Sequence, residues 1–253
     1  MAAQLDLVTI VMPLYNCAEY LSATVQSVIA QTNGHWRLNM VVDPKSADDS
    51  ARMAEAWAAQ DSRIQVLYAQ AKGVAAARNF GIQNAVGPYL AFLDADDVWL
   101  PCKLSEQLRA MHGAAAGFSC TRFRRVDRPG LKCGRLIGLP TRIRYRRLLQ
   151  QNCILTSTVM IDQRVHPVIQ FQDVGCEDFD LWLRLLRGGR ECLGIQQDLV
   201  RYRIVPGSRG SSKWRSLRET WQIYRQSVGL GRFLASSIMM PFLARNLLKY
   251  SRF

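Results

Sequence analysis

The chain of 253 residues has only three histidines, and its seven cysteines are scattered with no Cys-x-x-Cys pair. This odd set predicts neither a zinc site nor a disulfide framework, and it is typical of reduced thiols in the cytosol. No run of about 18 apolar residues occurs, so we expect no ordinary transmembrane helix. Because no basic segment precedes the first apolar run, we also expect no secretory signal. These absences favour a cytoplasmic protein.

Glycine-rich phosphate loops are absent as well. The sequence contains neither Gly-x-Gly-x-x-Gly nor Gly-x-x-x-x-Gly-Lys-[Ser/Thr], so nothing supports a dinucleotide site or a P-loop. What the chain does have is 49% apolar and 21% charged residues, which is enough to build a large core. Its length suits one large domain or one domain with an appended tail.

Positive charge is concentrated in two segments. Residues 122–147 hold ten Lys or Arg and one acid, Asp127, and residues 201–253 hold eleven Lys or Arg and one acid, Glu219. The rest of the chain has more acidic than basic residues. This asymmetry indicates a neutral or acidic active domain held against an anionic surface, and solvated charged faces are the simpler alternative.

Strands alternate with helices in the first half of the chain. Short apolar runs bounded by turn residues predict the strands, and apolar residues at helical spacing predict the helices. The alternation indicates an α/β fold with a Rossmann-like, mostly parallel sheet and helices on both faces. Two basic helices, at about 214–228 and 232–250, close the chain. The other predicted elements are strands 8–12 (stopped by Pro13), 38–42, 64–68, 89–93, 118–123 and 154–161, and helices from 21, over 49–60 and 74–85, from 101 and over 179–187.

Polar clusters follow three of these strands, where ligands bind in an open parallel sheet. They are Tyr15-Asn16, Asp43 and the segment Asp94-Ala95-Asp96-Asp97. Three acids within four residues repel one another, and a bound Mg²⁺ or Mn²⁺ relieves that repulsion while taking its other ligands from diphosphate oxygens and water. The alternative is that Asp96 caps the helix that follows.

Two further sets of residues can be interpreted either as ordinary structural features or as parts of a functional site. Arg78 lies in the helix that begins near Gly73, where its guanidinium could reach a diphosphate or could simply lie on the surface. Glu177-Asp178 precedes a run of apolar residues at helical spacing. That pair is either the N-terminal signal of a helix or a source of a general base.

Six segments of the chain carry motifs in a fixed order, and they extend from Val8 to about Ser211. They are Val8–Asn16 (a strand and P-x-Y-N), Ser27–Thr32 (S-V-L-x-Q-T), Gly73–Gly81 (G-x-x-x-A-R-N-x-G), Phe92–Asp97 (F-L-D-x-D-D), Glu177–Arg184 (E-D-x-x-L-W-L-R) and Tyr202–Ser208 (Y-R-x-H-P-G-S). In these motifs the chain resembles the inverting, family-2 nucleotide-sugar glycosyltransferases of the GT-A fold that build bacterial cell-envelope polysaccharides.

The resemblance implies a GT-A domain over residues 1–212, with a donor half to about 112 and an acceptor half from about 113. Basic amphipathic helices over 213–253 follow it. The residue roles that it implies are nucleotide contacts by Pro13, Tyr15 and Asp43, a diphosphate contact by Arg78, a place near the ribose and metal waters for Asp94, ligation of Mg²⁺ or Mn²⁺ by Asp96, and proton abstraction by Asp178 as the catalytic base.

The partners that the resemblance implies are a UDP-sugar donor and a saccharide or lipid-linked saccharide acceptor, with no nucleic acid. Residues 233–244 form an uncharged run that is too short to span a bilayer and that Pro241 interrupts. With basic and aromatic residues nearby, it predicts an interfacial element on the cytoplasmic face of the inner membrane. The alternative is that the run packs back on the domain.

Two positions depart from the family pattern. Val42-Asp43-Pro44-Lys45-Ser46 stands where the family has V-D-D-G-S, and Val205 replaces the late histidine. Two other functions compete with the glycosyltransferase prediction. A nucleic-acid-binding protein would use the basic segments, although no zinc-finger or RNP-like motif is present. A sugar nucleotidyltransferase would have a glycine-rich loop after its first strand, which this chain lacks.

Overall fold

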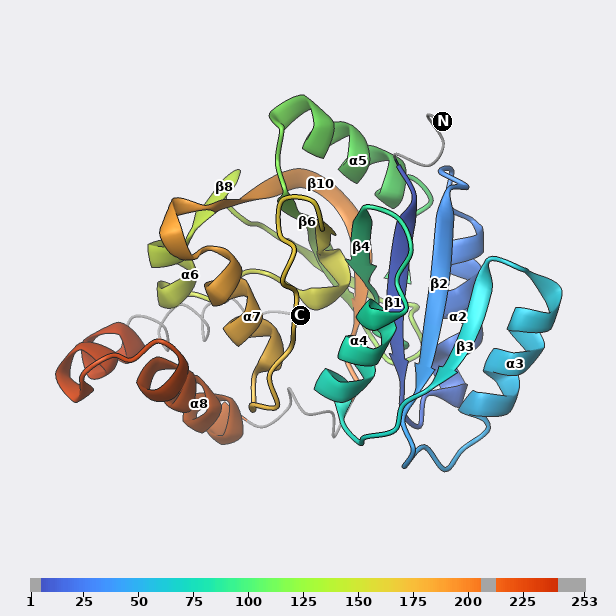
Figure 1. The fold of residues 1–253 in the computed structure, drawn as a ribbon, viewed down its shortest axis with the longest axis horizontal. Helices are drawn as coiled ribbons and strands as arrows, with labels where there is room; N and C mark the ends of the chain where they lie inside the picture. Colours follow the sequence, from blue (N-terminus) through green and yellow to red (C-terminus); the bar gives the residue numbers. More distant parts are fainter. Residues whose placement is uncertain (1–5, 206–212, 241–253) are drawn as a thin grey trace.

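The computed structural model describes residues 6–205 and 213–240. Within these residues a ten-stranded sheet runs through the molecule, with helices packed against both of its faces (Figure 1). Its strands are β1 (Val8–Leu14), β2 (Trp36–Val42), β3 (Ile64–Tyr68), β4 (Tyr89–Phe92), β5 (Val98–Trp99), β6 (Phe118–Val126), β7 (Cys133–Ile137), β8 (Arg142–Arg144), β9 (Met160–Asp162) and β10 (Glu191–Arg203). The helices are α2 (Ala18–Ile29), α3 (Ser50–Gln60), α4 (Val74–Gln83), α5 (Lys103–Ala114), α6 (Tyr145–Gln150), α7 (Glu177–Leu185) and α8 (Lys213–Gln222).

The sheet has the order β3-β2-β1-β4-β9-β6-β10-β5, with β7 beside β6 and β8 beside β10. Strands β3, β2, β1 and β4 are parallel, which confirms the predicted βαβ units. Beyond β4 the sheet is mixed, because β9 runs antiparallel to both β4 and β6. Antiparallel neighbours need no crossover helix, and the only α-helix that the chain forms between β6 and β9 is the six-residue α6.

The first strand continues one residue beyond Pro13, where the sequence predicted it to stop. The N–H of Val8 donates toward β2, to His35, whereas the carbonyl of Val11 accepts on the other side, from Leu93. Odd-numbered residues of β1 therefore direct their backbone groups toward β4, whose pairing ends at Val11. Since the donor that proline lacks would lie past the end of β4, no ladder hydrogen bond is lost.

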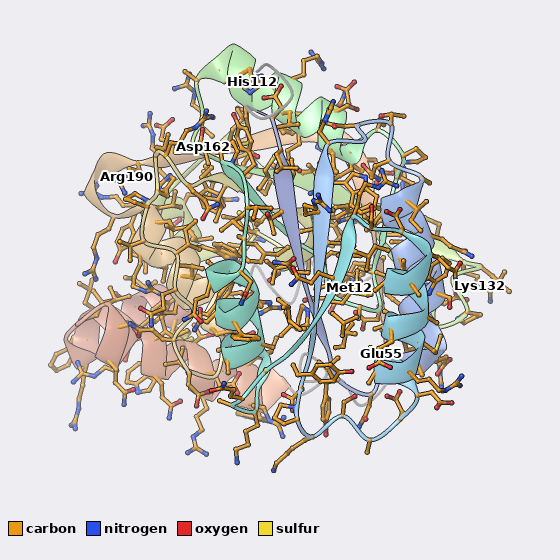
Figure 2. The ribbon with its side chains drawn as sticks, turned by 45° about the vertical axis from the view of Figure 1, so that its right-hand side comes forward. Met12, Glu55, His112, Lys132, Asp162 and Arg190 are labelled. Atoms are coloured by element: carbon orange, nitrogen blue, oxygen red, sulfur yellow. The ribbon has the colours of Figure 1, made fainter. Side chains whose placement is uncertain are left out.

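Each face of the sheet has its own core, because side chains alternate along a strand. Ile10 and Met12 of β1 pack with α2, α3 and α5, whereas Val11 packs on the opposite face with α4 and α7. Met12 is fully buried, while Glu55 on α3 and Lys132 before β7 lie at the surface (Figure 2). Helices on both faces are therefore confirmed.

The second half differs from the prediction at two places. The predicted strand 154–161 is mostly a loop and a 3₁₀ turn, Thr156–Thr158 (η1), and only Met160–Asp162 is strand. The longest strand, Glu191–Arg203, was not predicted. Its pairing with β6 shifts register between Ile195 and Asp198 and again before Val200, which breaks the two-residue alternation that reveals strands in a sequence.

The C-terminal segment is helical, as predicted, in the part that the structure describes. Helix α8 continues as a π-helix, Ile223–Ser227, and residues 232–240 are helical again. Ile223, Tyr224 and Ala235 are buried in the same core as α7, so this segment packs on the domain. The remainder of the predicted second helix, 241–250, lies outside the described residues. No helix among those described is long and apolar enough to cross a bilayer.

Candidate active site

The loops after β1 and β2 form one joined edge at the carboxyl ends of the parallel strands. The backbone N–H of Asn16 donates to the Ser46 hydroxyl (3.1 Å), and the Asn16 side-chain oxygen accepts the N–H of Ala47 (2.8 Å). Asn16 has a φ of 47°, a left-handed conformation that asparagine adopts more readily than most residues. Next to it, Tyr15 is 58% exposed, and its ring is available to a ligand at this edge.

Asp43 joins the end of β2 to the start of α4. Its side chain is buried, and its two oxygens accept the backbone N–H groups of Lys45 (2.8 Å) and Gly73 (2.7 Å). Gly73 has a φ of 101°, which favours glycine and lets its N–H point at the carboxylate. The structure thus gathers Pro13, Tyr15 and Asp43, the predicted nucleotide contacts, at the ends of β1 and β2.

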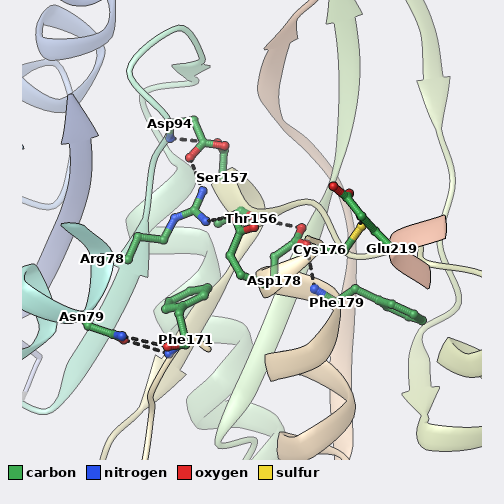
Figure 3. A network of polar contacts seen from close by, with 11 residues as sticks. Arg78, Asn79, Asp94, Thr156, Ser157, Phe171, Cys176, Asp178, Phe179 and Glu219 are labelled. Atoms are coloured by element: carbon green, nitrogen blue, oxygen red, sulfur yellow. Dashed lines mark hydrogen bonds and ion pairs between the residues drawn. The ribbon is translucent and has the colours of Figure 1, made fainter. Parts of the chain in front are cut away.

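Arg78 connects the acidic segment after β4 with the start of α7. Its guanidinium donates to Asp94 Oδ1 after β4 (Figure 3) and to Glu177 Oε1 at the start of α7, each at 2.7 Å. The neighbouring Asn79 exchanges two hydrogen bonds of 2.8 Å with the backbone of Phe171, whose ring lies 5.2 Å from the guanidinium carbon. Helix α4 therefore holds both the acidic segment and the loop that leads into α7.

This geometry does not favour the predicted role of Arg78. Its side chain is 5% exposed and already shared between two carboxylates, which raise its pKa above the usual range. Carboxylates engage two of its five N–H donors, and its burial restricts access by a diphosphate to the others. The arrangement suits a residue that positions Asp94 and Glu177 more than one that binds the donor directly.

Ser157 and Arg203 hold the acidic segment after β4, Asp94–Asp97, through hydrogen bonds. The Ser157 hydroxyl accepts the N–H of Asp94 (3.1 Å) and donates to the buried carboxylate of Asp97 (2.5 Å). The backbone N–H of Arg203 donates to the same carboxylate, and its guanidinium donates to the carbonyl of Asp96 (both 2.9 Å). Asp97 thus organises the turn, and burial with two neighbouring carboxylates raises its pKa well above the usual range.

The charge of Asp96 in the turn after β4 is incompletely compensated. Burial, and then the negative charge of Asp94, raise the pKa of Asp96 to about 6. Among residues 6–205 and 213–240, no group of three or more His, Cys, Asp or Glu side chains is placed to hold a metal ion. A single carboxylate whose neighbour repels it nevertheless fits a cation that takes its other ligands from phosphate and water.

Asp178 lies one residue into α7, so it is not the N-cap of that helix, a position that Cys176 occupies. Its two oxygens accept the N–H of Phe179 (2.7 Å) and the hydroxyl of Thr156 (3.2 Å) (Figure 3). Burial and the charge of Glu177 raise its pKa to about 6 against the opposing effect of these hydrogen bonds and of Arg78. Asp178 is therefore a half-buried, oriented carboxylate beside the strand ends.

Four residues of the site were not assigned from the sequence. Thr156 and Ser157 lie in a segment without a recognisable motif, so no signal pointed to them. Glu177 and Arg203 stand inside the E-D-x-x-L-W-L-R and Y-R segments, which could have identified them. The rest of that late motif, Pro206–Ser208, lies outside the described residues.

Comparison with known proteins identifies the family to which the chain belongs. The family description "Glycosyl transferase family 2" matches residues 9–164. The chain is 35% identical over 222 residues to the putative teichuronic acid biosynthesis glycosyltransferase TuaG of Bacillus subtilis, covering 87% of this chain and 88% of the relative. It is 32% identical over 219 residues to WfgD of Escherichia coli, covering 86% and 85%; that protein is named a UDP-Glc:α-D-GlcNAc-diphosphoundecaprenol β-1,3-glucosyltransferase.

Solved structures share the fold. S. aureus TarS residues 1–349 in complex with UDP superpose with a TM-score of 0.69 at 14% identity, over 95% of this chain and 72% of that one. The mannosyltransferase PcManGT of Pyrobaculum calidifontis, in complex with GDP-Man and Mn²⁺, gives 0.65 at 17% identity, over 92% and 68%. These structures bear out the predicted GT-A fold. The family match, the two relatives and the fold agree with the motifs, and the chain belongs to glycosyl transferase family 2 as a glycosyltransferase.

Proposed function

We propose that this enzyme transfers a sugar from a UDP-sugar to a saccharide carried on a lipid diphosphate, with inversion at the anomeric carbon, in the synthesis of a cell-surface polysaccharide. The names of TuaG and WfgD support this pathway and acceptor class, and the UDP complex of TarS supports the nucleotide. The observation that carries the proposal is the oriented carboxylate of Asp178, linked through Glu177 and Arg78 to Asp94 at the strand ends.

The chemistry assigned to Asp178 is general-base catalysis. Its carboxylate accepts the proton of the acceptor hydroxyl as that oxygen attacks the anomeric carbon, and the nucleoside diphosphate leaves from the opposite face. A single displacement inverts the configuration, as in inverting glycosidases, where the carboxylate also serves as base. A pKa of about 6 suits this role, because the group is ionised at pH 7 yet more basic than an ordinary aspartate.

The donor binds, in this proposal, beyond β1, β2 and β4. Pro13, Tyr15 and Asp43 contact the nucleotide, and Asp94 lies near the ribose. Arg78 acts by holding Asp94 and Glu177 in place, in keeping with its burial. We retain the division into a donor half to about residue 112 and an acceptor half from about 113 to 212, with residues 213–253 as a separate C-terminal segment.

Asp96 is the residue that would hold a divalent cation. When bound, Mg²⁺ or Mn²⁺ supplies positive charge that stabilises the leaving diphosphate. The Mn²⁺ in the PcManGT complex and the raised pKa of Asp96 beside Asp94 support this assignment. The replacement of the family's histidine by Val205 leaves diphosphate oxygens and water as the other ligands.

The C-terminal helices carry exposed side chains that suit an anionic membrane surface. Large apolar side chains are exposed there, and arginines accompany them. Aromatic and basic residues together favour the interface of a bilayer that contains anionic lipids. This surface would place the enzyme peripherally on the cytoplasmic face of the inner membrane. Its exposed apolar side chains are Trp214, Phe233, Leu234 and Met240, and its arginines are Arg215, Arg218, Arg225 and Arg232.

A thermal-shift screen followed by a transfer assay tests the proposal. UDP, GDP and their sugars are added with Mg²⁺, with Mn²⁺ or with chelator, since a ligand of the folded state raises its stability. We expect UDP with cation to raise Tm, and the matching UDP-sugar to be transferred to a synthetic diphospholipid-linked N-acetylglucosamine. Stabilisation by GDP alone would overturn the nucleotide assignment, and absence of transfer to the diphospholipid and to free saccharides would overturn the proposal.

A further inference from the structure

A cavity of about 280 Å³ lies between the loop before α7 and the end of α8. From the loop it is lined by Asp173, Val174 and Gly175. From the helix it is lined by two pairs of residues four apart, Gln222 with Gln226 and Ile223 with Ser227. The last residue of α8 and the π-helix that continues it, Ile223–Ser227, therefore form one wall.

The cavity is close to the proposed base. Gly175 precedes Asp178 by three residues, which limits the distance between their Cα atoms to about 11 Å. Helix α8 is fixed to this loop by Glu219, whose carboxylate accepts the thiol hydrogen of Cys176 (3.4 Å). A side chain at Gly175 would bring its Cβ within 2.0 Å of Glu219 Cγ, so only glycine lets α8 approach this closely.

The opposite side of the same helical segment is anchored to α7. Tyr224 is fully buried, its hydroxyl donates to the carbonyl of Leu149, and its ring packs edge-on against Phe179 with centroids 6.2 Å apart. The N–H of Phe179 in turn donates to Asp178. The wall of the cavity and the base therefore share one rigid support, which is what a site that orients a substrate toward the base requires.

The lining suits a sugar ring. It combines two amides, a carboxylate and a hydroxyl with the apolar side chain of the half-buried Val174, and Ile223, which is 2% exposed, closes the wall from the core side. Amides and carboxylates bind sugar hydroxyls as donors and acceptors, and apolar groups cover the C–H faces of the ring. Within the part of the chain that the structure describes, the side chains of Asp173, Gln222 and Gln226 make no hydrogen bond of their own. A volume just below the usual range of about 300–1,000 Å³ fits one sugar and not a nucleotide sugar.

We infer that this cavity binds the acceptor saccharide, with Gln222 and Gln226 as its specificity-determining residues. The inference rests on the proposed function, since it names the site from which the acceptor presents its hydroxyl to Asp178. It also gives α8 a second role: the helix that carries the exposed Trp214 at one end forms the acceptor wall at the other.

Direct binding tests the inference on the full chain. Saturation-transfer NMR is recorded with methyl α-glycosides of N-acetylglucosamine, N-acetylgalactosamine, glucose, galactose and mannose, with UDP and Mg²⁺ or Mn²⁺ present. The variants are Gln222→Ala, Gln226→Ala and the double variant. The matched control is Gln65→Ala, which removes an exposed amide from β3 at the far edge of the sheet. Because Gln226 is exposed, its replacement leaves the packing of α8 intact.

We expect at least one glycoside to bind the parent and the Gln65 variant, and to lose its signal in the double variant. In the transfer assay, the acceptor KM rises about 3- to 10-fold for each single variant and about 10- to 100-fold for the double variant, while donor KM and slow donor hydrolysis stay unchanged. Glycoside signals equal in parent and double variant, or absent from the parent, overturn the inference. Failure of the parent to bind UDP or any nucleotide sugar refutes the proposed function instead.

Discussion

Replacing Asp178 with Asn should abolish transfer and stabilise the fold at the same time. An amide cannot take the proton of the acceptor hydroxyl, and the loss of a general base typically lowers the rate about 10²- to 10⁴-fold. The amide can keep both local contacts, because its oxygen accepts the N–H of Phe179 and its NH₂ donates to the Thr156 hydroxyl. Donor binding should therefore be unchanged.

The gain in stability follows from the raised pKa of Asp178. A folded-state pKa of about 6 against 3.8 means that ionising this carboxyl costs more in the folded protein than in the unfolded chain. The stability that the protonated form supplies is present below pH 4 and is lost as the pH rises through about 6. A rise in pKa of this size corresponds to about 3 kcal/mol in the free energy of unfolding for a side chain that is fully shielded from solvent. Because the side chain is partly exposed, we expect the Asn variant to gain about 1–2 kcal/mol at pH 7.5.

Calorimetry at several pH values measures this gain. At pH 7.5 we expect Tm to rise by about 2–8 °C in the Asn variant. The difference between variant and parent should shrink as the pH falls from about 6 toward about 4, where the parent is itself protonated. The transfer rate of the parent should also fall as the pH is lowered through about 6, because protonation of Asp178 removes the base.

Asp180→Asn on the same helix is the matched control. Asp180 is 1% exposed and holds Arg184 at 2.8 Å, so its replacement should lower stability by about 1–3 kcal/mol and leave transfer chemistry intact. Turnover of the Asp178→Asn variant at the parental rate would refute the base assignment. A lower Tm at pH 7.5 that does not depend on pH would refute the electrostatic argument.

Three further outcomes follow from the same structure. Arg78→Met leaves two partly buried carboxylates without their partner and should cost about 3–5 kcal/mol, seen as a Tm lower by about 6–20 °C; an unchanged Tm would contradict its positioning role. Asp96→Ala should fold normally but lose the cation-dependent part of UDP stabilisation in the thermal-shift assay, and retention of that part would remove it as the metal ligand. The double variant Trp214→Ser, Phe233→Ser should reduce flotation with anionic vesicles about 10-fold or more, because each exposed ring loses its apolar contact with lipid. The control is Leu131→Ser, which replaces a similarly exposed side chain on another part of the domain, and equal flotation of the double variant and this control would refute the membrane surface.

Shortening the chain at residue 212 is a poor test of that surface. Part of the predicted interfacial run, 233–244, packs back on the domain, since Ala235 is buried and Ile238 and Met239 contact the core that contains α7. Removing residues 213–253 would uncover this core. Single exposed side chains such as Phe233 can be replaced without that consequence.

Local sequence was enough to determine the first half of the fold. Each strand from β1 to β4 is a short apolar run bounded by turn residues, and each helix between them has apolar residues at helical spacing. Parallel strands in βαβ units place their carboxyl ends at one edge, so the order of the elements alone brings Tyr15, Asp43 and Asp94 together. The motif order then indicated the family, which the comparisons show.

Other features of the fold and the site depend on tertiary contacts that local sequence patterns do not contain. The bulges of β10 break its alternation, and its place between β6 and β5 depends on partners about 75 to 100 residues away in the chain. The burial of Arg78 arises only when Asp94 and Glu177 meet across a distance of 83 residues in sequence. Thr156 and Ser157 acquire their roles because a 3₁₀ turn carries them under the acidic segment. Sequence spacing encodes which side chains share a face, whereas the pKa of a carboxylate depends on the charges and solvent that folding places around it.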